Sequence, residues 1–377
     1  MVEGCTPFEI LLPISEQDAF AEYLTGGGKV EDVLSKIDIR KAEAFKPSDQ
    51  ANINRLVAES MGHGRLNELV TTEMRKWFLS TAQSVLSKMT NDERLISELQ
   101  LNITKMNIVL GRLGEAETAL VSRQEKQLAL GAESNKIAET LCELGTVKWK
   151  LGQLESALSV LIEARQIYGE SSQGRSMGSP LSKSEMLLGD ITNRIGTVLY
   201  DQGKFADAMQ SYTESLAIRS RCFGDGRDMA TTFNNIGNVE DSLGNFTKAI
   251  EYHEKALEIR TKCFGLHHVD VAMSEKNIGV SLIKKGDLKN ALIRFKKALE
   301  IEEKCLGRHH VEVARTEKNI GVVVFQIGDH ENALIRYKKA LDIEEKCLGR
   351  HHAVADTNNN IGEVYSHLGD LEKAMFH

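Results

Sequence analysis

A unit of 41 or 42 residues recurs through the C-terminal half of this 377-residue chain, and this period constrains the fold more than any other feature. The dipeptide Ile-Gly marks each copy, and its glycines are Gly196, Gly237, Gly279, Gly321 and Gly362. A second glycine follows each of these by seven residues, and an alanine follows that glycine by five. Self-similarity of this length is typical of solenoids, in which each supersecondary unit packs mainly on its neighbours. The sequence therefore predicts a repeat array and favours binding over catalysis.

Residues 272–313 form one complete unit and carry the pattern of two helices. In its first part, apolar residues recur at helical spacing until Gly286, which we expect in a turn. In its second part, small and aromatic residues such as Phe295 and Ala298 fall on one side. We expect the charged residues of this second helix, Glu302 among them, to face water.

The columns of this unit resemble those of the tetratricopeptide repeat through the series Ile278-Gly279, Leu282, Gly286, Ala291, Phe295 and Ala298. Ile and Leu stand where that family usually has Leu and Tyr. The longer period and the linker from Gly265 to Ala272 are similar to the repeats of kinesin light chains, although Val269 replaces the usual proline. The resemblance implies an all-α fold, in which helix pairs form a right-handed superhelix (an α-solenoid).

The pattern weakens toward the N-terminus and divides the chain into three parts. Residues 93–377 are predicted to hold the array, with six repeats and a truncated seventh, because the chain stops within a second helix. Residues 63–92 are expected to form a connecting amphipathic helix. Residues 1–62 read as a small, incomplete α/β segment that resembles the tail of a Toll/interleukin-receptor-like domain. We therefore expect a fragment of a longer protein.

Composition excludes several classes of partner. The net charge is −7, so no basic field predicts nucleic acid as a partner, and no apolar run is long enough to predict a membrane partner. Four cysteines share one column of the repeat, where the repeat spacing is too wide for disulfides between neighbours: Cys222, Cys263, Cys305 and Cys347. We interpret them as small packing residues in a reducing compartment and predict a cytoplasmic protein.

Three motifs suggest chemistry, but each has a simpler interpretation. Residues Gly174 to Gly178 match the G-x-S-x-G elbow of hydrolases, yet no apolar strand precedes them. Residues Gly26 to Lys29 lack the first glycine and the following Ser or Thr of a phosphate-binding loop. The histidine pairs follow the repeat period, so we expect them to pack or cap between repeats, with a metal-binding or pH-sensing role as the alternative: His267-His268, His309-His310 and His351-His352. We predict no enzyme activity, no cofactor and no metal site.

The candidate binding residues directly precede the Ile-Gly dipeptides of the repeats. Two residues before the repeat glycines lie Arg194, Asn235, Asn277, Asn319 and Asn360, and three residues before lie Asn193, Asn234, Lys276, Lys318 and Asn359. The family resemblance implies that these first-helix positions line a concave groove. An asparagine amide can both donate and accept, so it can pair with an extended peptide backbone. The two lysines would favour an acidic ligand. The alternative is that the asparagines stabilise helix packing.

The predicted function is a non-enzymatic scaffold that binds a peptide or a partner helix of another protein in this groove. One alternative is a cargo adaptor like kinesin light chain, but the chain shows no sustained heptads ahead of the repeats for motor binding. Another alternative is the sensor arm of a multidomain signalling protein, which a longer transcript with a βα-alternating domain ahead of Met1 would support.

Overall fold

The computed structural model describes residues 62–88, 93–172, 183–221, 226–348 and 352–376. All secondary structure in these ranges is helical, as the repeat pattern predicts. The helices fall into two compact units, one containing residues 67–222 and the other residues 223–377. The predicted α/β segment, the Gly26 to Lys29 turn and the Gly174 to Gly178 motif lie outside the described residues, apart from Gly62.

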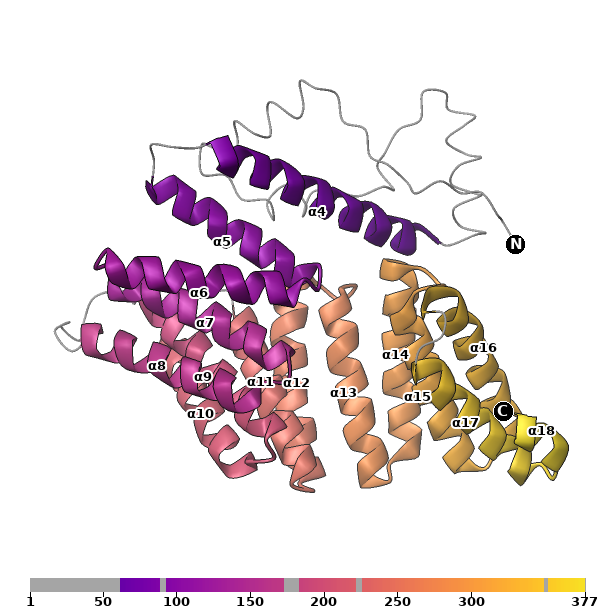
Figure 1. The fold of residues 1–377 in the computed structure, drawn as a ribbon. Coiled ribbons are helices and arrows are strands. Elements are labelled where there is room, and N and C mark those ends of the chain that lie inside the picture. Colours follow the sequence, from indigo (N-terminus) through magenta and orange to yellow (C-terminus); the bar gives the residue numbers. More distant parts are fainter. Residues whose placement is uncertain (1–61, 89–92, 173–182, 222–225, 349–351, 377) are drawn as a thin grey trace. The chain divides into compact units, whose positions relative to one another are not determined.

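The first unit contains seven helices among its described residues, and the second contains eight. The helices of the first unit are α4 (Gly62–Lys88), α5 (Glu93–Val109), α6 (Leu113–Ala129), α7 (Ser134–Lys150), α8 (Leu154–Ser172), α9 (Lys183–Asp201) and α10 (Phe205–Arg221). Those of the second are α11 (Arg227–Ser242), α12 (Phe246–Phe264), α13 (Val269–Lys285), α14 (Leu288–Leu306), α15 (Val311–Ile327), α16 (His330–Leu348), α17 (His352–His367) and α18 (Leu371–Phe376). From α5 onward, consecutive helices pack in pairs, which is the arrangement of a solenoid (Figure 1).

The two glycines of a repeat serve different purposes, as Gly279 and Gly286 show. A Cβ atom at Gly279 would lie 2.8 Å from Cζ of Phe295, so the absence of a side chain lets α13 approach the buried ring on α14. Gly286 has a φ of +88°, the left-handed conformation that ends α13. The close approach recurs in both units, where the repeat glycine faces the side chains of Leu161, Tyr212, His253, Phe295 and Tyr337.

In two of the linkers, a histidine caps the start of the first helix of the next repeat. Nδ1 of His268 accepts a hydrogen bond from the backbone N–H of Asp270 at 3.2 Å. In the next repeat, Nδ1 of His310 accepts one from Glu312 at 3.1 Å. The capping interpretation is therefore confirmed for the second histidine of the pair in these two linkers, whereas His351 lies outside the described residues.

One prediction about the second helices was wrong. Glu302 was expected to face water, but its side chain on α14 is fully buried. Its carboxylate accepts a hydrogen bond from Oγ1 of Thr316 on α15 at 2.6 Å and lies 2.7 Å from Nζ of Lys276 on α13. A buried carboxylate is tolerated here because these partners on two neighbouring helices replace water.

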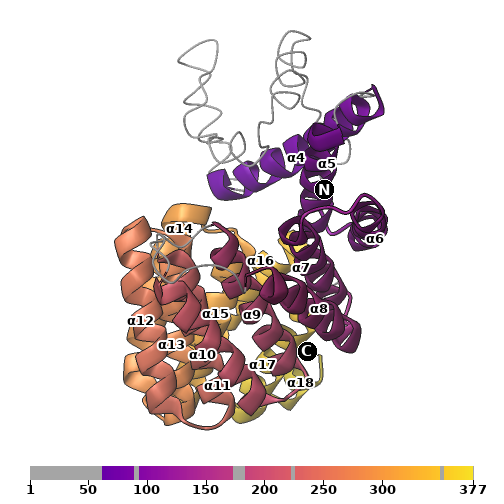
Figure 2. The ribbon, with the colours of Figure 1, turned by 90° about the vertical axis from the view of Figure 1, so that its left-hand side faces the viewer.

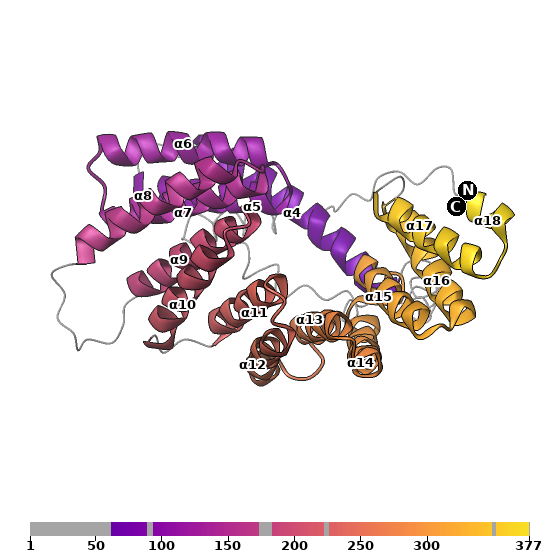
Figure 3. The ribbon, with the colours of Figure 1, turned by 90° about the horizontal axis from the view of Figure 1, so that it is seen from below.

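Alternate helices line opposite sides of the second unit. In Figure 3, the first helices α11, α13, α15 and α17 lie along the inner side of its curve, and the second helices α12, α14 and α16 lie along the outer side. Figure 2 shows α12 and α13 packed side by side. The residues that precede the repeat glycines therefore belong to the helices of the inner side.

At the N-terminal end of the described chain, α4 packs on α5. Phe78, Leu79 and Ala82 of α4 are buried in one cluster with Leu99 and Ile103 of α5. No helix in the described ranges has the length and apolar character needed to cross a membrane.

Candidate functional site

The candidate site is a row of asparagines on the first helices of the second unit. This Asn row consists of Asn235 on α11, Asn277 on α13, Asn319 on α15 and Asn360 on α17. All four side chains are half-buried, so each lies at the surface of the inner helices without being fully solvated. A half-buried amide that lacks a partner is a ready hydrogen-bonding group for a ligand.

One member of the row links two repeats. Nδ2 of Asn277 donates a hydrogen bond to Oδ1 of Asn234 on α11 at 2.6 Å, and Asn234 is itself buried. This bond joins two successive first helices across the repeat boundary. For this pair, the amides contribute to helix packing, which is the alternative that the sequence left open.

The bond cannot recur in the next two repeats. In the place of Asn234, α13 and α15 carry Lys276 and Lys318, and an ammonium group has no acceptor to offer. Among the described residues, the side-chain amides of Asn319 and Asn360 have no hydrogen-bond partner. The C-terminal half of the Asn row therefore presents two unused amides.

The two lysines of the predicted site are engaged with carboxylates. Nζ of Lys276 lies 2.7 Å from the carboxylate of Glu302 and 2.7 Å from that of Glu312. Nζ of Lys318 lies 3.7 Å from Glu344, which is fully buried. Their charge thus neutralises glutamates of the fold, and less of it is left for an acidic ligand.

Burial and ion pairing shift the pKa values of the two carboxylates around Lys276 in opposite directions. Burial raises the pKa of Glu302, although the charge of Lys276 and the hydroxyl of Thr316 act against it. Burial also acts to raise the pKa of Glu312, but the hydrogen bond and charge of Lys276 outweigh it, and this pKa is lowered. The lysine is therefore an internal counter-ion for both groups.

In the first unit, the corresponding positions connect α9 to α7. The guanidinium of Arg194 donates a hydrogen bond to Oγ1 of Thr146 and lies 3.5 Å from the carboxylate of Glu143. Asn193 is buried. Arg194 thus joins successive first helices, as Asn277 does in the second unit. Asn359 on α17 is exposed.

Sequence reasoning missed a buried ionisable column on the second helices. Each member bonds a hydroxyl of the following first helix: Arg260 bonds Ser274, Glu302 bonds Thr316 and Glu344 bonds Thr357. Arg123 makes a similar bond to Thr140 from a position one helical turn earlier on α6. The signal was present in the sequence, because each of these hydroxyl residues stands five positions before a repeat glycine, or before its counterpart Gly145. The column changes from arginine to glutamate along the chain.

Two cysteines near the ends of second helices contact the backbone of the preceding linker. Within the described residues, no group of three or more His, Cys, Asp or Glu side chains could hold a metal ion. Sγ of Cys305 donates to the backbone oxygen of His267 at 3.2 Å, and Sγ of Cys347 donates to that of His309 at 3.1 Å. The described cysteines Cys142, Cys263, Cys305 and Cys347 form no disulfide with one another.

Paired helices, glycine contacts and capped linkers together define a helical repeat scaffold. A family model described as tetratricopeptide repeat matches residues 187–262, 270–346 and 312–377. The chain is a tetratricopeptide repeat protein. Among curated proteins, no sequence match reaches significance.

Solved structures with the same fold are similar at low sequence identity. BtubC (BKLC) from P. vanneervenii is 21% identical with a TM-score of 0.52, over 59% of this chain and 87% of that chain. A STAND protein with a tetratricopeptide repeat sensor from Pyrococcus horikoshii is 14% identical with a TM-score of 0.62, over 97% of this chain and 53% of that one. A Rap protein complexed with Competence and Sporulation Factor is 16% identical with a TM-score of 0.53, over 82% and 92% of the two chains.

Proposed function

We propose that the second unit binds an extended peptide segment of a partner protein along the Asn row. The observation that carries this proposal is the pair of unused, half-buried amides at Asn319 and Asn360. They lie on α15 and α17, which are successive first helices of the inner side, so a single extended segment can reach both. A backbone N–H and C=O would satisfy each amide irrespective of the peptide sequence.

The engaged lysines change the expected ligand. Because Lys276 and Lys318 neutralise Glu302 and Glu344, recognition of the peptide backbone contributes more to binding than acidic side chains do. Side chains of the peptide would select among partners through the residues around the row. A tetratricopeptide array with this arrangement is a protein-interaction scaffold and needs no catalytic group.

The test compares two double variants with the wild type in a fluorescence anisotropy screen of a degenerate peptide library. The test variant is Asn319→Ala with Asn360→Ala, and the control is Asn290→Ala with Asn332→Ala. The control residues are exposed at the starts of α14 and α16, so the chemical change is the same away from the row. We expect the test variant to bind selected peptides at least about tenfold more weakly and the control to bind like the wild type. Equal binding by all three proteins would place the interface elsewhere.

A sensor arm of a multidomain signalling protein is the second candidate. The fold similarity to the Pyrococcus horikoshii STAND protein, whose repeats are a sensor, extends over 97% of this chain. Such an arm would also bind its ligand through the repeats, and a catalytic or nucleotide-binding domain encoded ahead of Met1 would distinguish it from a free-standing scaffold. We infer a cytoplasmic location because the described cysteines of the repeat column form no disulfide with one another, which suits a reducing compartment.

A further inference from the structure

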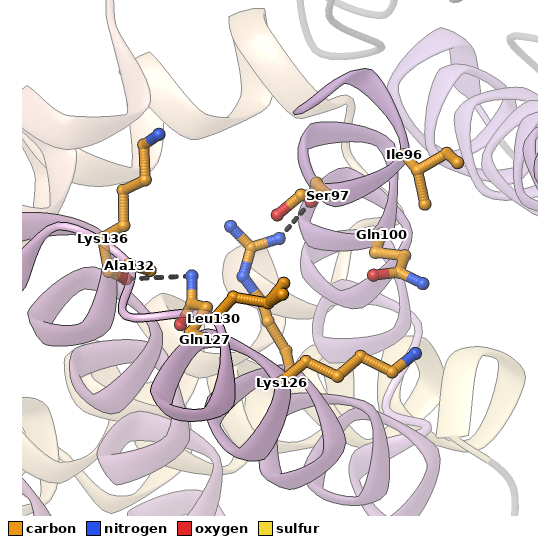
Figure 4. Close-up of a pocket in the computed structure, with 9 residues that line it drawn as sticks. Ile96, Ser97, Gln100, Lys126, Gln127, Leu130, Ala132 and Lys136 are labelled. Atoms are coloured by element: carbon orange, nitrogen blue, oxygen red, sulfur yellow. Dashed lines mark hydrogen bonds between the residues drawn. The ribbon is translucent and has the colours of Figure 1, made fainter. Parts of the chain in front are cut away.

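A pocket of about 380 Å³ lies in the first unit between α5, α6 and α7. Figure 4 shows the side chains that line it: Ile96, Ser97 and Gln100 from α5, Arg123, Lys126 and Gln127 from α6, Leu130 and Ala132 from the following turn, and Lys136 from α7. The volume is within the range of small-molecule sites. The lining holds three cationic side chains and no carboxylate.

Arg123 is a buried cation without a counter-ion. It is 8% exposed, and its hydrogen bonds go to neutral acceptors, from Nε to Oγ1 of Thr140 at 3.0 Å and from Nη1 to the backbone oxygen of Ser97. No carboxylate of the described residues lies within ion-pair distance of it. Burial lowers the pKa of Arg123. The charges of Glu139 and Glu98 act to raise this pKa, but only from a distance.

A second buried arginine in the same unit shows what is missing. Arg219 on α10 is equally buried, but its guanidinium lies 2.5 Å from the carboxylate of Asp190 on α9. Removing a guanidinium from water without an anionic partner is unfavourable. An anion in the pocket would give Arg123 the partner that Asp190 gives Arg219.

The remaining lining residues restrict that anion further. Lys126 and Lys136 are exposed, and their ammonium groups point to different sides of the pocket (Figure 4). Gln127 is buried, and its Oε1 has no hydrogen-bond partner among the described residues, so a rotation of the amide toward the pocket would let a ligand N–H satisfy it. Ile96 and Leu130 add apolar surface. The wall thus offers cations, one acceptor and an apolar patch.

We propose that this pocket binds an acylated amino acid or a similar small carboxylate. The carboxylate would contact Arg123, and the two lysines would attract its negative charge from different sides of the pocket. The neighbouring N–H would donate to Gln127, and an apolar side chain would cover Ile96 and Leu130. A free small molecule and the C-terminal residue of a peptide share this chemistry.

The test uses the full chain and isothermal titration calorimetry with N-acetyl-L-leucine. We expect N-acetyl-L-leucine to bind with a dissociation constant of about 1 mM. N-acetyl-L-leucinamide, which lacks the negative charge, should bind at least about tenfold more weakly. The double variant Lys126→Gln with Lys136→Gln should bind at least about fivefold more weakly. A control with Lys150→Gln and Lys204→Gln, both exposed in the same unit, should bind like the wild type.

Absence of binding to N-acetyl-L-leucine, equal binding of its amide, or equal loss in both lysine double variants would each overturn the proposal. The variant Arg123→Gln, accepted only if circular dichroism shows a folded protein, should lose binding. The peptide N-acetyl-Gly-Gly-Leu separates the two sources of the ligand. Tighter binding than N-acetyl-L-leucine indicates a peptide C-terminus, and equal or weaker binding indicates a free small molecule.

Discussion

Nζ of Lys276 lies 2.7 Å from Oε1 of Glu302, a carboxylate with no exposure to solvent. Lys276 stands on α13, Glu302 on α14, and the hydroxyl of Thr316 on α15 donates to the same carboxylate. Glu312 accepts a second interaction from the lysine at 2.7 Å. Three consecutive helices are therefore joined through one buried charge, and its removal should affect stability in an asymmetric way.

Changing Lys276→Met should destabilise the second unit by about 3 kcal/mol, because Glu302 remains buried without a counter-ion. Changing Glu302→Gln should cost only about 1 kcal/mol, because Lys276 keeps Glu312 and the amide can still bond Thr316. Urea denaturation followed by circular dichroism measures both. The exposed pair of Lys304 and Glu300 supplies the control, since Lys304→Met should change stability by less than about 0.5 kcal/mol. Equal losses for Lys276→Met and Glu302→Gln would contradict the counter-ion role.

The raised pKa of Glu302 predicts how stability depends on pH. Burial, opposed by Lys276, makes the folded protein hold this proton to a higher pH than the unfolded chain does. The contribution of Glu302 to the free energy of unfolding therefore falls as pH rises from the ordinary glutamate pKa of 4.5 through the raised pKa of the folded protein. Above that pKa the contribution is constant. Glu302→Gln removes this dependence. The stability of the variant relative to the wild type, measured as urea midpoints, should increase as pH rises above the ordinary value of 4.5. A difference that does not change with pH would show that Glu302 does not titrate in this range.

Gly279→Ala should destabilise the protein by about 2 kcal/mol, because the new Cβ would lie 2.8 Å from Cζ of the fully buried Phe295. Gly114→Ala is the matched control. It lies in the first turn of α6, where an added Cβ meets nothing within 4 Å, so the change should be neutral or slightly stabilising. Thermal unfolding of the two variants provides the comparison. A similar melting temperature for both would mean that the close approach of α13 and α14 is not required.

The histidine caps predict that asparagine at position 310 recovers most of the stability that alanine there loses. His310→Ala removes the acceptor for the backbone N–H of Glu312 and should cost about 1 kcal/mol. His310→Asn should recover most of this loss, since asparagine is a preferred residue at helix N-termini. Urea denaturation of the three proteins tests this. If asparagine gave no recovery, the histidine would act through packing instead.

The sequence predicted what depends on neighbouring residues. The spacing of Gly279, Gly286 and Phe295 predicted the first helix, the turn after it and the packing contact with the second helix. Helical periodicity and left-handed glycine geometry are local properties, so they can be read from the sequence. The burial of Glu302 was not predicted, since its partners Lys276 and Thr316 stand on different helices. In sequence it lies among the charged residues Glu300, Glu303 and Lys304.

The candidate site was also predictable only in part from the sequence. The column of asparagines was visible from the repeat alone, but the bond from Asn277 to Asn234 spans 43 residues and depends on how closely α11 and α13 approach. The engagement of Lys276 and Lys318 also requires the positions of glutamates on second helices. Which amides are unused could therefore be decided only from the folded structure.

Backbone recognition by the Asn row is the central claim, and N-methylation of a bound peptide tests it most directly. A peptide selected by the wild type would be methylated at one backbone nitrogen at a time, and each form would be titrated by fluorescence anisotropy. We predict that methylation at one or two positions weakens binding to the wild type by about tenfold, and that this penalty disappears in the Asn319→Ala, Asn360→Ala variant. An equal penalty in both proteins would contradict the claim, because the methylated nitrogen would then contact some other group.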